Sequence, residues 1–184
     1  MDTVVRDPYR EALEAATGLP VTDLFTRRDG SAYPALERGE LPEADYWASY
    51  AEAGIPVDVE AFHAARRAGY RWLPGMRELL ADLEGHVLRV AASNYPTWID
   101  EVAEGVLGGV FDDVHASCHL GVRKPEEAFF VRLLGRLDAS ADEVVFVDDR
   151  EANVAGARAV GMRAHRFEGA SSLRAWLRDC GLVV

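Results

Sequence analysis

The stretch of sequence that decides the fold of this chain is Val144-Val145-Phe146-Val147-Asp148-Asp149-Arg150. Its four apolar residues have the β-branched and aromatic character of a buried strand, and two adjacent carboxylates follow directly. In an open α/β sheet, ligands bind outside the carboxyl ends of the strands, which is where this pattern places Asp148 and Asp149. Adjacent carboxylates repel each other unless a cation neutralises them, so the pair is a candidate site for Mg²⁺, which prefers oxygen ligands. A polar turn that caps the next helix fits the same pattern.

Length, composition and charge limit the possible classes of protein. The chain has 184 residues, of which 49% are apolar and 28% charged, as expected for one globular domain or for one domain with an inserted lobe. Its net charge of −11 argues against nucleic acid and anionic membranes as partners. With two cysteines and no run of about 18 apolar residues, we expect a soluble protein of the reducing cytoplasm, without a membrane span or an export signal.

The two parts of the chain differ in their sequence pattern. Between residues 8 and 72, apolar residues recur every three or four positions and Gly and Pro interrupt them, which predicts a helical segment. From residue 73 onward, strand and helix patterns alternate, which predicts an α/β fold with a parallel sheet and helices on both faces. The expected strands are 87–92, 110–116, 144–147 and 162–167, and the expected helices are 76–83, 98–106, 126–137, 153–160 and 173–179.

Polar residues follow the expected strands at two further places. Ser93 and Asn94 come after the strand at 87–92, where the hydroxyl and the next backbone N–H could bind an anion at a helix start. Lys124 stands just ahead of the helix at 126–137. Each residue has a simpler explanation, Ser93 as a helix cap and Lys124 as a solvated lysine. Taken in order with the acidic pair, they predict one shared site at the carboxyl edge of the sheet.

This combination of motifs resembles the haloacid dehalogenase (HAD) superfamily of phosphohydrolases. The resemblance rests on Ala92-Ser93-Asn94, on Gly121-Val122-Arg123-Lys124-Pro125, and on Val145-Phe146-Val147-Asp148-Asp149-Arg150 with Asn153, Ala157 and Gly161. Residues 35–41 are similar to part of the small helical cap in the branch that holds bacterial sugar-phosphate phosphatases and the phosphatase domain of soluble epoxide hydrolases. The resemblance implies a Rossmann-like α/β core domain at 73–184, a helical cap at 8–72, and a remnant of the first strand at 1–7.

The resemblance also implies a chemistry, that of a Mg²⁺-dependent phosphatase acting on a small phosphorylated metabolite. In the family, an Asp nucleophile forms an aspartyl-phosphate that water hydrolyses, and a second Asp two residues later is the general acid and base. By resemblance, Ser93 and Asn94 bind the phosphate. Lys124 offsets the charge of nucleophile and phosphate, and Asp148 with Asp149 holds Mg²⁺. The cap would close over the site and select the leaving group.

The chain departs from the family pattern at the nucleophile. When the family's Asp-x-Asp motif is placed over the start of the chain, Asp2 takes the acid/base position and the nucleophile falls one residue before Met1. A disordered terminal residue is the other interpretation of Asp2. In the family, the first strand is the middle of the sheet. Because strands lie about 4.8 Å apart, its truncation or loss predicts a gap of roughly 10 Å with unpaired backbone groups on both sides.

Three explanations of the missing strand stay open. The start could be assigned too late, which we favour; the chain could be a degenerate relative that fills the gap otherwise; or a partner chain could supply the strand. The alternative function is accordingly a catalytically inactive HAD-like protein that binds a ligand or a partner. An unpaired strand edge favours self-association, for example as a homodimer. The substrate stays unidentified because the cap would select it.

Overall fold

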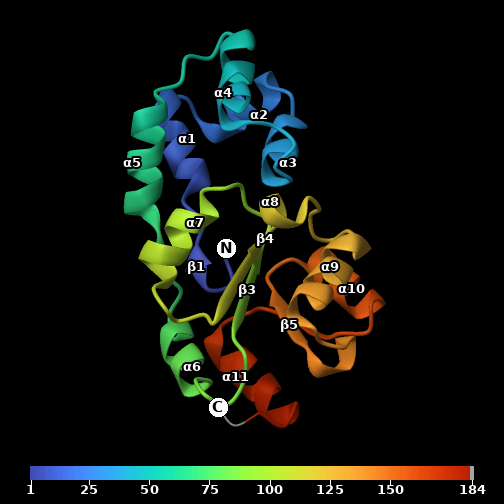
Figure 1. Cartoon of the computed structure of the whole chain (residues 1–184). Helices are drawn as coiled ribbons and strands as arrows, with labels where there is room; N and C mark the ends of the chain where they lie inside the picture. Colours follow the sequence, from blue (N-terminus) through green and yellow to red (C-terminus); the bar gives the residue numbers. More distant parts are fainter. Residues whose placement is uncertain (183–184) are drawn as a thin grey trace.

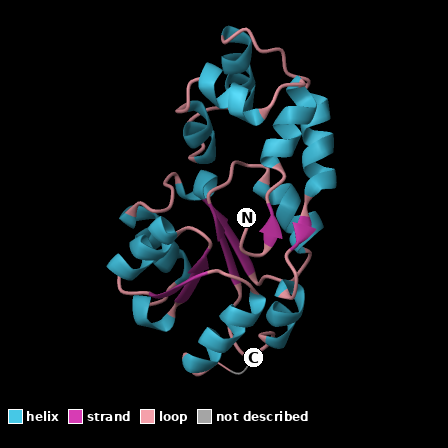
Figure 2. Ribbon diagram, turned by 180° about the vertical axis from the view of Figure 1, so that it is seen from behind, coloured by secondary structure: helices cyan, strands magenta, loops and turns pink. Residues whose placement is uncertain are grey.

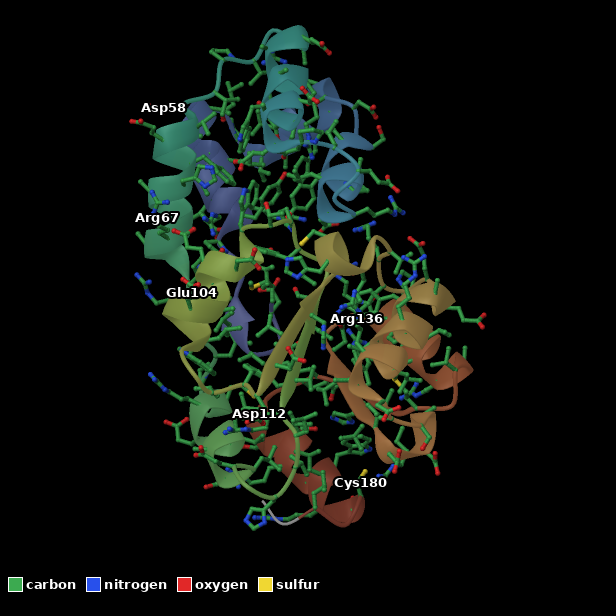
Figure 3. The ribbon with its side chains drawn as sticks, viewed as in Figure 1. Asp58, Arg67, Glu104, Asp112, Arg136 and Cys180 are labelled. Carbon is green, nitrogen blue, oxygen red and sulfur yellow. The ribbon has the colours of Figure 1, made fainter. Side chains whose placement is uncertain are left out.

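The computed structural model of the chain, which describes residues 1–182, shows a helical part above an α/β part (Figure 1). The helices of the first part are α1 (Tyr9–Thr17), α2 (Val21–Arg27), α3 (Ala32–Glu37), α4 (Glu43–Glu52) and α5 (Val59–Gly69). Gly18 ends α1 with a φ of 68°, and the Asp58 carboxylate caps α5 by accepting a hydrogen bond from the Ala61 backbone N–H. Figure 3 shows Asp58 and Arg67 along α5 at the outer edge of the molecule.

Two short strands lie where the helical part begins and ends. β1 (Val5–Arg6) and β2 (Arg71–Trp72) pair in antiparallel fashion, Val5 opposite Trp72. The sequence pattern did not predict β2, because two residues are too few to show a strand periodicity. The pairing brings the two ends of the helical segment together. It also shows that Val5 and Arg6 pair with β2, while the preceding Thr3 and Val4 line the space between the strands β3 and β5 described below.

The α/β part follows the predicted alternation. Its elements are α6 (Met76–Asp82), β3 (Val90–Ser93), α7 (Ile99–Val102), the π-helix η1 (Ala103–Leu107), β4 (Asp113–Ala116), α8 (Ser117–Leu120), α9 (Glu127–Leu137), the 3₁₀ helix η2 (Ala141–Glu143), β5 (Val145–Asp148), α10 (Glu151–Ala159), β6 (Arg163–Arg166) and α11 (Ala170–Asp179). The short helix α8, which was not predicted, begins directly after β4. Within residues 1–182, none of these helices or of those in the first part is long and apolar enough to cross a membrane.

The strands of this part form two separate pairs. β3 and β4 are parallel, with Val90 opposite Asp113, and β5 and β6 are parallel, with Val145 opposite Arg163. Within residues 1–182 no ladder joins β3 to β5, so the expected single sheet is divided into two half sheets (Figure 2). The division falls between the strands that end in Ser93 and in Asp148, where the gap was predicted.

The hydrophobic core joins the two parts of the chain. One cluster contains Leu13, Tyr46 and Phe62 from the helical part together with Tyr95, Trp98, Ile99 and Ala116 from the α/β part. A second cluster packs α9 and α10 against β5, and a third lies between α6 and α11. Because the first cluster crosses the boundary, the helical part shares its core with the α/β part.

Candidate active site

A cavity of about 260 Å³ lies at the carboxyl ends of β3 and β5, between the two parts of the chain. The six residues that the sequence singled out all line it: Asp2, Ser93, Asn94, Lys124, Asp148 and Asp149. They come from the start of the chain and from three loops that are far apart in the sequence. β3 ends in Ser93 and β5 ends in Asp148, so the carboxyl ends of both strands reach this cavity.

Lys124 lies at the centre of this arrangement and is 7% exposed. Its Nζ donates hydrogen bonds to the Ala92 backbone oxygen at 2.8 Å and to Asp148 Oδ2 at 2.6 Å, so it bridges the two half sheets. It is also the only lysine in the chain, where all other basic side chains besides His are Arg. The presence of a single lysine is a sequence signal that the motifs described above did not include. A compact ammonium suits this buried position better than a planar guanidinium.

Asn94 fixes the backbone of the lysine loop. Its Nδ2 donates to the Lys124 backbone oxygen at 2.8 Å, and its Oδ1 accepts from the Lys124 backbone N–H at 2.8 Å. The side chain of Asn94 is therefore occupied in holding Lys124. The neighbouring Ser93 is 7% exposed, and its hydroxyl makes no hydrogen bond with any residue of the described chain 1–182. Its hydroxyl is free to bind a ligand in the cavity.

Asp148 is held by three partners besides its packing. Oδ2 faces Lys124, while Oδ1 accepts from the Arg150 backbone N–H at 2.9 Å and from Asn153 Nδ2 at 2.8 Å. Burial by itself would raise the pKa of Asp148, but the charge of Lys124 and these hydrogen bonds outweigh it and hold the pKa below its ordinary value. Asp148 is therefore an ionised carboxylate inside the protein, and Asn153 orients it.

Asp149 is the freer member of the acidic pair. It is partly buried, and its Oδ1 accepts one long hydrogen bond, at 3.4 Å, from the Thr3 hydroxyl. Among the described residues, no group of three or more His, Cys, Asp or Glu side chains is arranged to hold a metal. Mg²⁺ commonly binds to one or two carboxylates and fills its remaining positions with water and substrate phosphate. The donor set of Asp148 and Asp149 therefore fits a partly hydrated Mg²⁺.

Asp2 lies in an ordered turn at the edge of the cavity. Its backbone N–H donates to the Val5 oxygen at 2.7 Å, its φ is 55°, and its Oδ1 accepts from the Asp7 backbone N–H at 2.9 Å. The side chain is exposed.

Asp7 is a cavity residue that the sequence analysis did not identify. Its Oδ1 accepts from the Tyr9 backbone N–H at 3.1 Å and from the Tyr95 hydroxyl at 3.4 Å. Burial raises the pKa of Asp7, and its hydrogen bonds only partly oppose that shift. The only sequence signal was an acid at the start of the first helix, and helix caps commonly have one.

The helical part contributes the aromatic side chains Tyr9, Phe25 and Tyr33 to the cavity, together with the charged Arg10 and Glu37. Tyr9 and Tyr33 stack with ring centroids 4.2 Å apart, and the Arg10 guanidinium lies 5.5 Å from the Phe25 centroid. Polar and charged groups from the α/β part face these side chains across the cavity. The site thus combines a polar floor suited to an oxyanion with an aromatic face suited to an organic group.

Comparison with known proteins now identifies the family. Residues 10–161 match the haloacid dehalogenase-like hydrolases. The chain belongs to this family. It is 32% identical over 186 residues to the chloroplast flavin mononucleotide hydrolase 1 of Arabidopsis thaliana, a match that covers 100% of this chain and 76% of that protein. It is 31% identical over 151 residues to the sesquiterpene phosphatase astK of Aspergillus oryzae, covering 79% of this chain and 77% of the relative.

Solved structures share the fold of this HAD-like hydrolase. A HAD family enzyme of Bacteroides thetaiotaomicron superposes with a TM-score of 0.77 at 16% identity, over 95% of this chain and 93% of that one. A HAD-like hydrolase of Porphyromonas gingivalis gives a TM-score of 0.75 at 21% identity, over 93% of this chain and 89% of the other. The family and the HAD-like α/β fold expected from the sequence motifs are thereby confirmed.

Proposed function

We propose that this HAD-like hydrolase is a Mg²⁺-dependent phosphatase that acts on a small phosphate ester. One observation carries the proposal: Ser93, Lys124 and Asp148, from three separate loops, surround one cavity of about 260 Å³. A hydroxyl, an ammonium and a carboxylate placed together can bind a phosphoryl group and its counter-ion. The names of the relatives support the proposal, since they describe a flavin mononucleotide hydrolase, a sesquiterpene phosphatase and a ribulose-1,5-bisphosphate 5-phosphatase.

In this proposal each of the polar cavity residues Ser93, Lys124, Asp148 and Asp149 has a separate role. The Ser93 hydroxyl donates to a phosphoryl oxygen, and Lys124 offsets the negative charge of phosphate and carboxylates. Asp149 and Asp148 hold Mg²⁺, which when bound stabilises charge on the phosphoryl oxygens. In support, the related Bacteroides fold has been solved with magnesium, and with magnesium and inorganic phosphate together.

The proposed reaction has two displacement steps. A carboxylate oxygen attacks phosphorus while the ester P–O bond breaks, and the leaving alcohol takes its proton from Asp2. Water then attacks the acyl phosphate, Asp2 takes back a proton, and the carboxylate and inorganic phosphate are released. Asp148 cannot serve as the nucleophile without losing its ion pair with Lys124. By resemblance to the family, the attacking carboxylate is the first Asp of the Asp-x-Asp motif, whose second Asp corresponds to Asp2.

We propose that residues 8–72 act as a cap that selects the leaving group. Phe25, Tyr33 and Tyr9 line the cavity opposite the phosphate floor, so they would contact the organic part of the ester. Aromatic faces favour leaving groups that are themselves planar or apolar. We therefore rank flavin mononucleotide and isoprenoid phosphates above small sugar phosphates as substrates.

A second candidate function is phosphate-ester binding without turnover. The specific observation in its favour is the charge pairing in the cavity, because Asp148 is committed to Lys124. A protein of this kind would retain Ser93 and Lys124 as ligands for the phosphate. Both functions predict that the cavity binds a phosphate ester, and only the first predicts that the ester is hydrolysed.

One assay separates the two functions. The chain, and a version extended by an apolar strand ending in Asp before Met1, are incubated with p-nitrophenyl phosphate, flavin mononucleotide and a sugar phosphate, with Mg²⁺ or with EDTA. Release of phosphate that requires Mg²⁺ would support the phosphatase. Saturable binding of inorganic phosphate without turnover in either version would support the binding protein. Neither binding nor turnover would contradict both.

A further inference from the structure

Arg66 of α5 carries a positive charge inside the core, between the helical part and the α/β part. It is 1% exposed, and its guanidinium lies 5.4 Å from a ring centroid of Trp98. Its Nη2 pairs with the exposed carboxylate of Glu101, and its Nη1 donates to the Tyr70 hydroxyl at 3.0 Å. An arginine is rarely buried to this extent unless polar partners hold it. The contact with Tyr70 leads from this buried charge toward the candidate active site.

Two tyrosine hydroxyls continue the contact. The hydroxyl oxygens of Tyr70 and Tyr95 lie 2.7 Å apart, and the Tyr95 hydroxyl donates to Asp7 Oδ1 at 3.4 Å. The Arg66 guanidinium can only donate hydrogen bonds, and the Asp7 carboxylate can only accept them. The proton of Tyr70 therefore points to Tyr95, and the proton of Tyr95 points to Asp7. Hydrogen bonds that follow one another in one direction polarise and strengthen each other.

Asp7 extends the chain of hydrogen bonds to Asp2. The Asp7 backbone N–H donates to Asp2 Oδ1 at 2.9 Å, and both residues line the cavity. The chain thus holds Asp7 by its side chain, and Asp7 holds the Asp2 carboxylate by its backbone. In the proposed function, Asp2 gives its proton to the leaving alcohol, a step that requires a well-defined position of the acid.

The fold explains how these residues meet. Arg6 of β1 lies opposite Arg71 of β2 in the antiparallel pair. Asp7 and Tyr70 are the next residues on these two segments, so the pairing brings them to the same place. Tyr95 reaches them from the loop that follows β3. The chain of hydrogen bonds therefore crosses from the helical part to the α/β part.

The loop after β3 contacts three parts of the site through three successive residues. Ser93 lines the cavity, where its hydroxyl is available to a phosphoryl oxygen in the proposed function. Asn94 binds the backbone of Lys124 through two hydrogen bonds. Tyr95 binds Asp7. One loop thus relates the position of the phosphate, the lysine and the acid.

We propose that Arg66, Tyr70 and Tyr95 are positioning residues for Asp2, acting through Asp7. The proposal rests on the proposed function, in which Asp2 is the general acid and base. Among residues 1–182, none of the three positioning residues is part of the cavity lining, so they act on the substrate only through the chain. An acid assists the departure of a poor leaving group more than that of a good one. The chain should therefore matter most for alkyl phosphates.

Hydrogen exchange tests the coupling without any need for turnover. Tyr95→Phe keeps the ring and removes the hydroxyl that reaches Asp7. Tyr50→Phe is the matched control, since Tyr50 is fully buried and its hydroxyl contacts the Tyr46 hydroxyl, at 3.0 Å, outside the chain. We expect the Asp7 backbone amide to exchange roughly threefold or more faster in Tyr95→Phe, measured by NMR, and at the wild-type rate in Tyr50→Phe. Equal exchange in the two variants would overturn the proposal.

Kinetics with two matched esters test the effect on the acid. In the version of the chain that releases phosphate in the assay above, 4-nitrobenzyl phosphate and 4-nitrophenyl phosphate are compared. Tyr95→Phe should lower kcat/KM about tenfold for the benzyl ester and less than about twofold for the phenyl ester, because nitrophenolate leaves without a proton. Tyr50→Phe should change neither value. Equal losses with the two esters would indicate a general structural effect and overturn the proposal.

A double variant tests whether the tyrosines act as one chain. Tyr70→Phe with Tyr95→Phe should lose no more activity on the benzyl ester than Tyr95→Phe alone, since the chain is already broken. Multiplying losses would show separate actions and overturn the proposal. Faster Asp7 exchange in Tyr95→Phe, with no hydrolysis of either ester, would count against the phosphatase and keep the chain to Asp2. Unchanged exchange together with Mg²⁺-dependent hydrolysis would remove the positioning role and keep the phosphatase.

Discussion

At the scale of single residues, the candidate site depends on one ammonium group. Lys124 Nζ reaches a backbone oxygen of β3 and a carboxylate of β5, at 2.8 and 2.6 Å. A guanidinium carries the same charge, but it is planar, larger and less able to approach both acceptors in a 7% exposed position. The identity of the cation, and not only its charge, should therefore matter.

We predict that Lys124→Arg loses nearly as much activity as Lys124→Ala, about 100-fold or more in kcat/KM, because neither restores the bridging geometry. Steady-state kinetics of the extended form measure this loss. Arg136→Lys is the matched control, since Arg136 is an exposed residue of α9 (labelled in Figure 3) and is not among the residues that line the cavity. Amine-reactive labelling gives a second readout: the control should gain a rapidly labelled lysine, whereas Lys124 should react slowly. Full activity of Lys124→Arg would contradict the prediction.

The two adjacent acids should differ sharply in their effect on stability. Asp148→Asn leaves the buried Lys124 without its counter-charge, which should lower the free energy of unfolding by about 3–5 kcal/mol at pH 7. Asp149→Asn removes a charge but keeps an oxygen that can accept the long hydrogen bond from Thr3, so it should cost about 0.5 kcal/mol or less. Urea denaturation of the two variants measures the difference. Similar losses in both would show that the Lys124 ion pair does not stabilise the fold.

At acid pH, the wild-type chain should lose the extra stability that Asp148 gives it relative to Asp148→Asn. Because the pKa of Asp148 is held below its ordinary value of 3.8, the folded state binds its proton less readily than the unfolded state. The stabilisation is therefore complete above that ordinary pKa, and it decreases as the pH falls toward the lower pKa of the folded state. Unfolding free energies of wild type and Asp148→Asn should converge below about pH 4. A constant difference from pH 7 to pH 2 would exclude this linkage.

At the scale of elements, close packing of α10 sets the position of the lysine loop. A Cβ added to Gly156 would lie 2.7 Å from the Pro125 backbone oxygen and 2.8 Å from a ring carbon of Phe130. Pro125 directly follows Lys124 in the chain, so a shift of the Pro125 backbone away from the added Cβ would disturb the loop that carries Lys124. Gly156 therefore permits the helix to approach the loop that carries the ammonium.

We predict that Gly156→Ala lowers the free energy of unfolding by about 1–3 kcal/mol and also reduces activity, because the loop must shift. Gly135→Ala is the matched control in α9, where an added Cβ meets nothing within 4 Å. It should raise stability by up to about 1 kcal/mol through helix propensity and leave activity unchanged. Denaturation curves and kcat/KM of both variants provide the measurement. An active and stable Gly156→Ala would contradict the packing argument.

At the scale of the whole molecule, the helical part is built as an extension of the α/β part. Phe62 of α5 lies 5.1 Å from Trp98 between ring centroids, and both belong to the cluster that crosses the boundary. The proposed cap at 8–72 therefore relies on the rest of the chain for part of its core. Independent folding of the two parts would expose that shared surface to water.

We predict one cooperative unfolding transition for the whole chain, with equal calorimetric and van't Hoff enthalpies. Phe62→Leu, in the helical part, should lower the midpoint of that single transition, since the shared cluster loses packing. Differential scanning calorimetry measures both quantities. Two transitions, only one of them shifted by the substitution, would show that the parts fold separately.

The sequence by itself determined the class of fold and its order of elements. Strand and helix periodicities placed β3, β5 and α9 to within a few residues, because local apolar patterns report which face of an element is buried. The motifs also singled out Ser93 and Asp148 at the ends of strands and Lys124 just ahead of α9, and all three line the cavity. The gap beside β3 was expected because no apolar run at the start of the chain could supply a central strand.

Only the tertiary structure decided how these residues work together. Asp7 enters the cavity because β1 and the first turn of α1 lie beside it, and Asn94 holds Lys124 through contacts 30 residues apart in sequence. The division into two half sheets and the aromatic side chains of the cavity are also long-range features. Periodicity describes the environment of one element at a time. Which elements become neighbours depends on packing among segments that are distant in the chain.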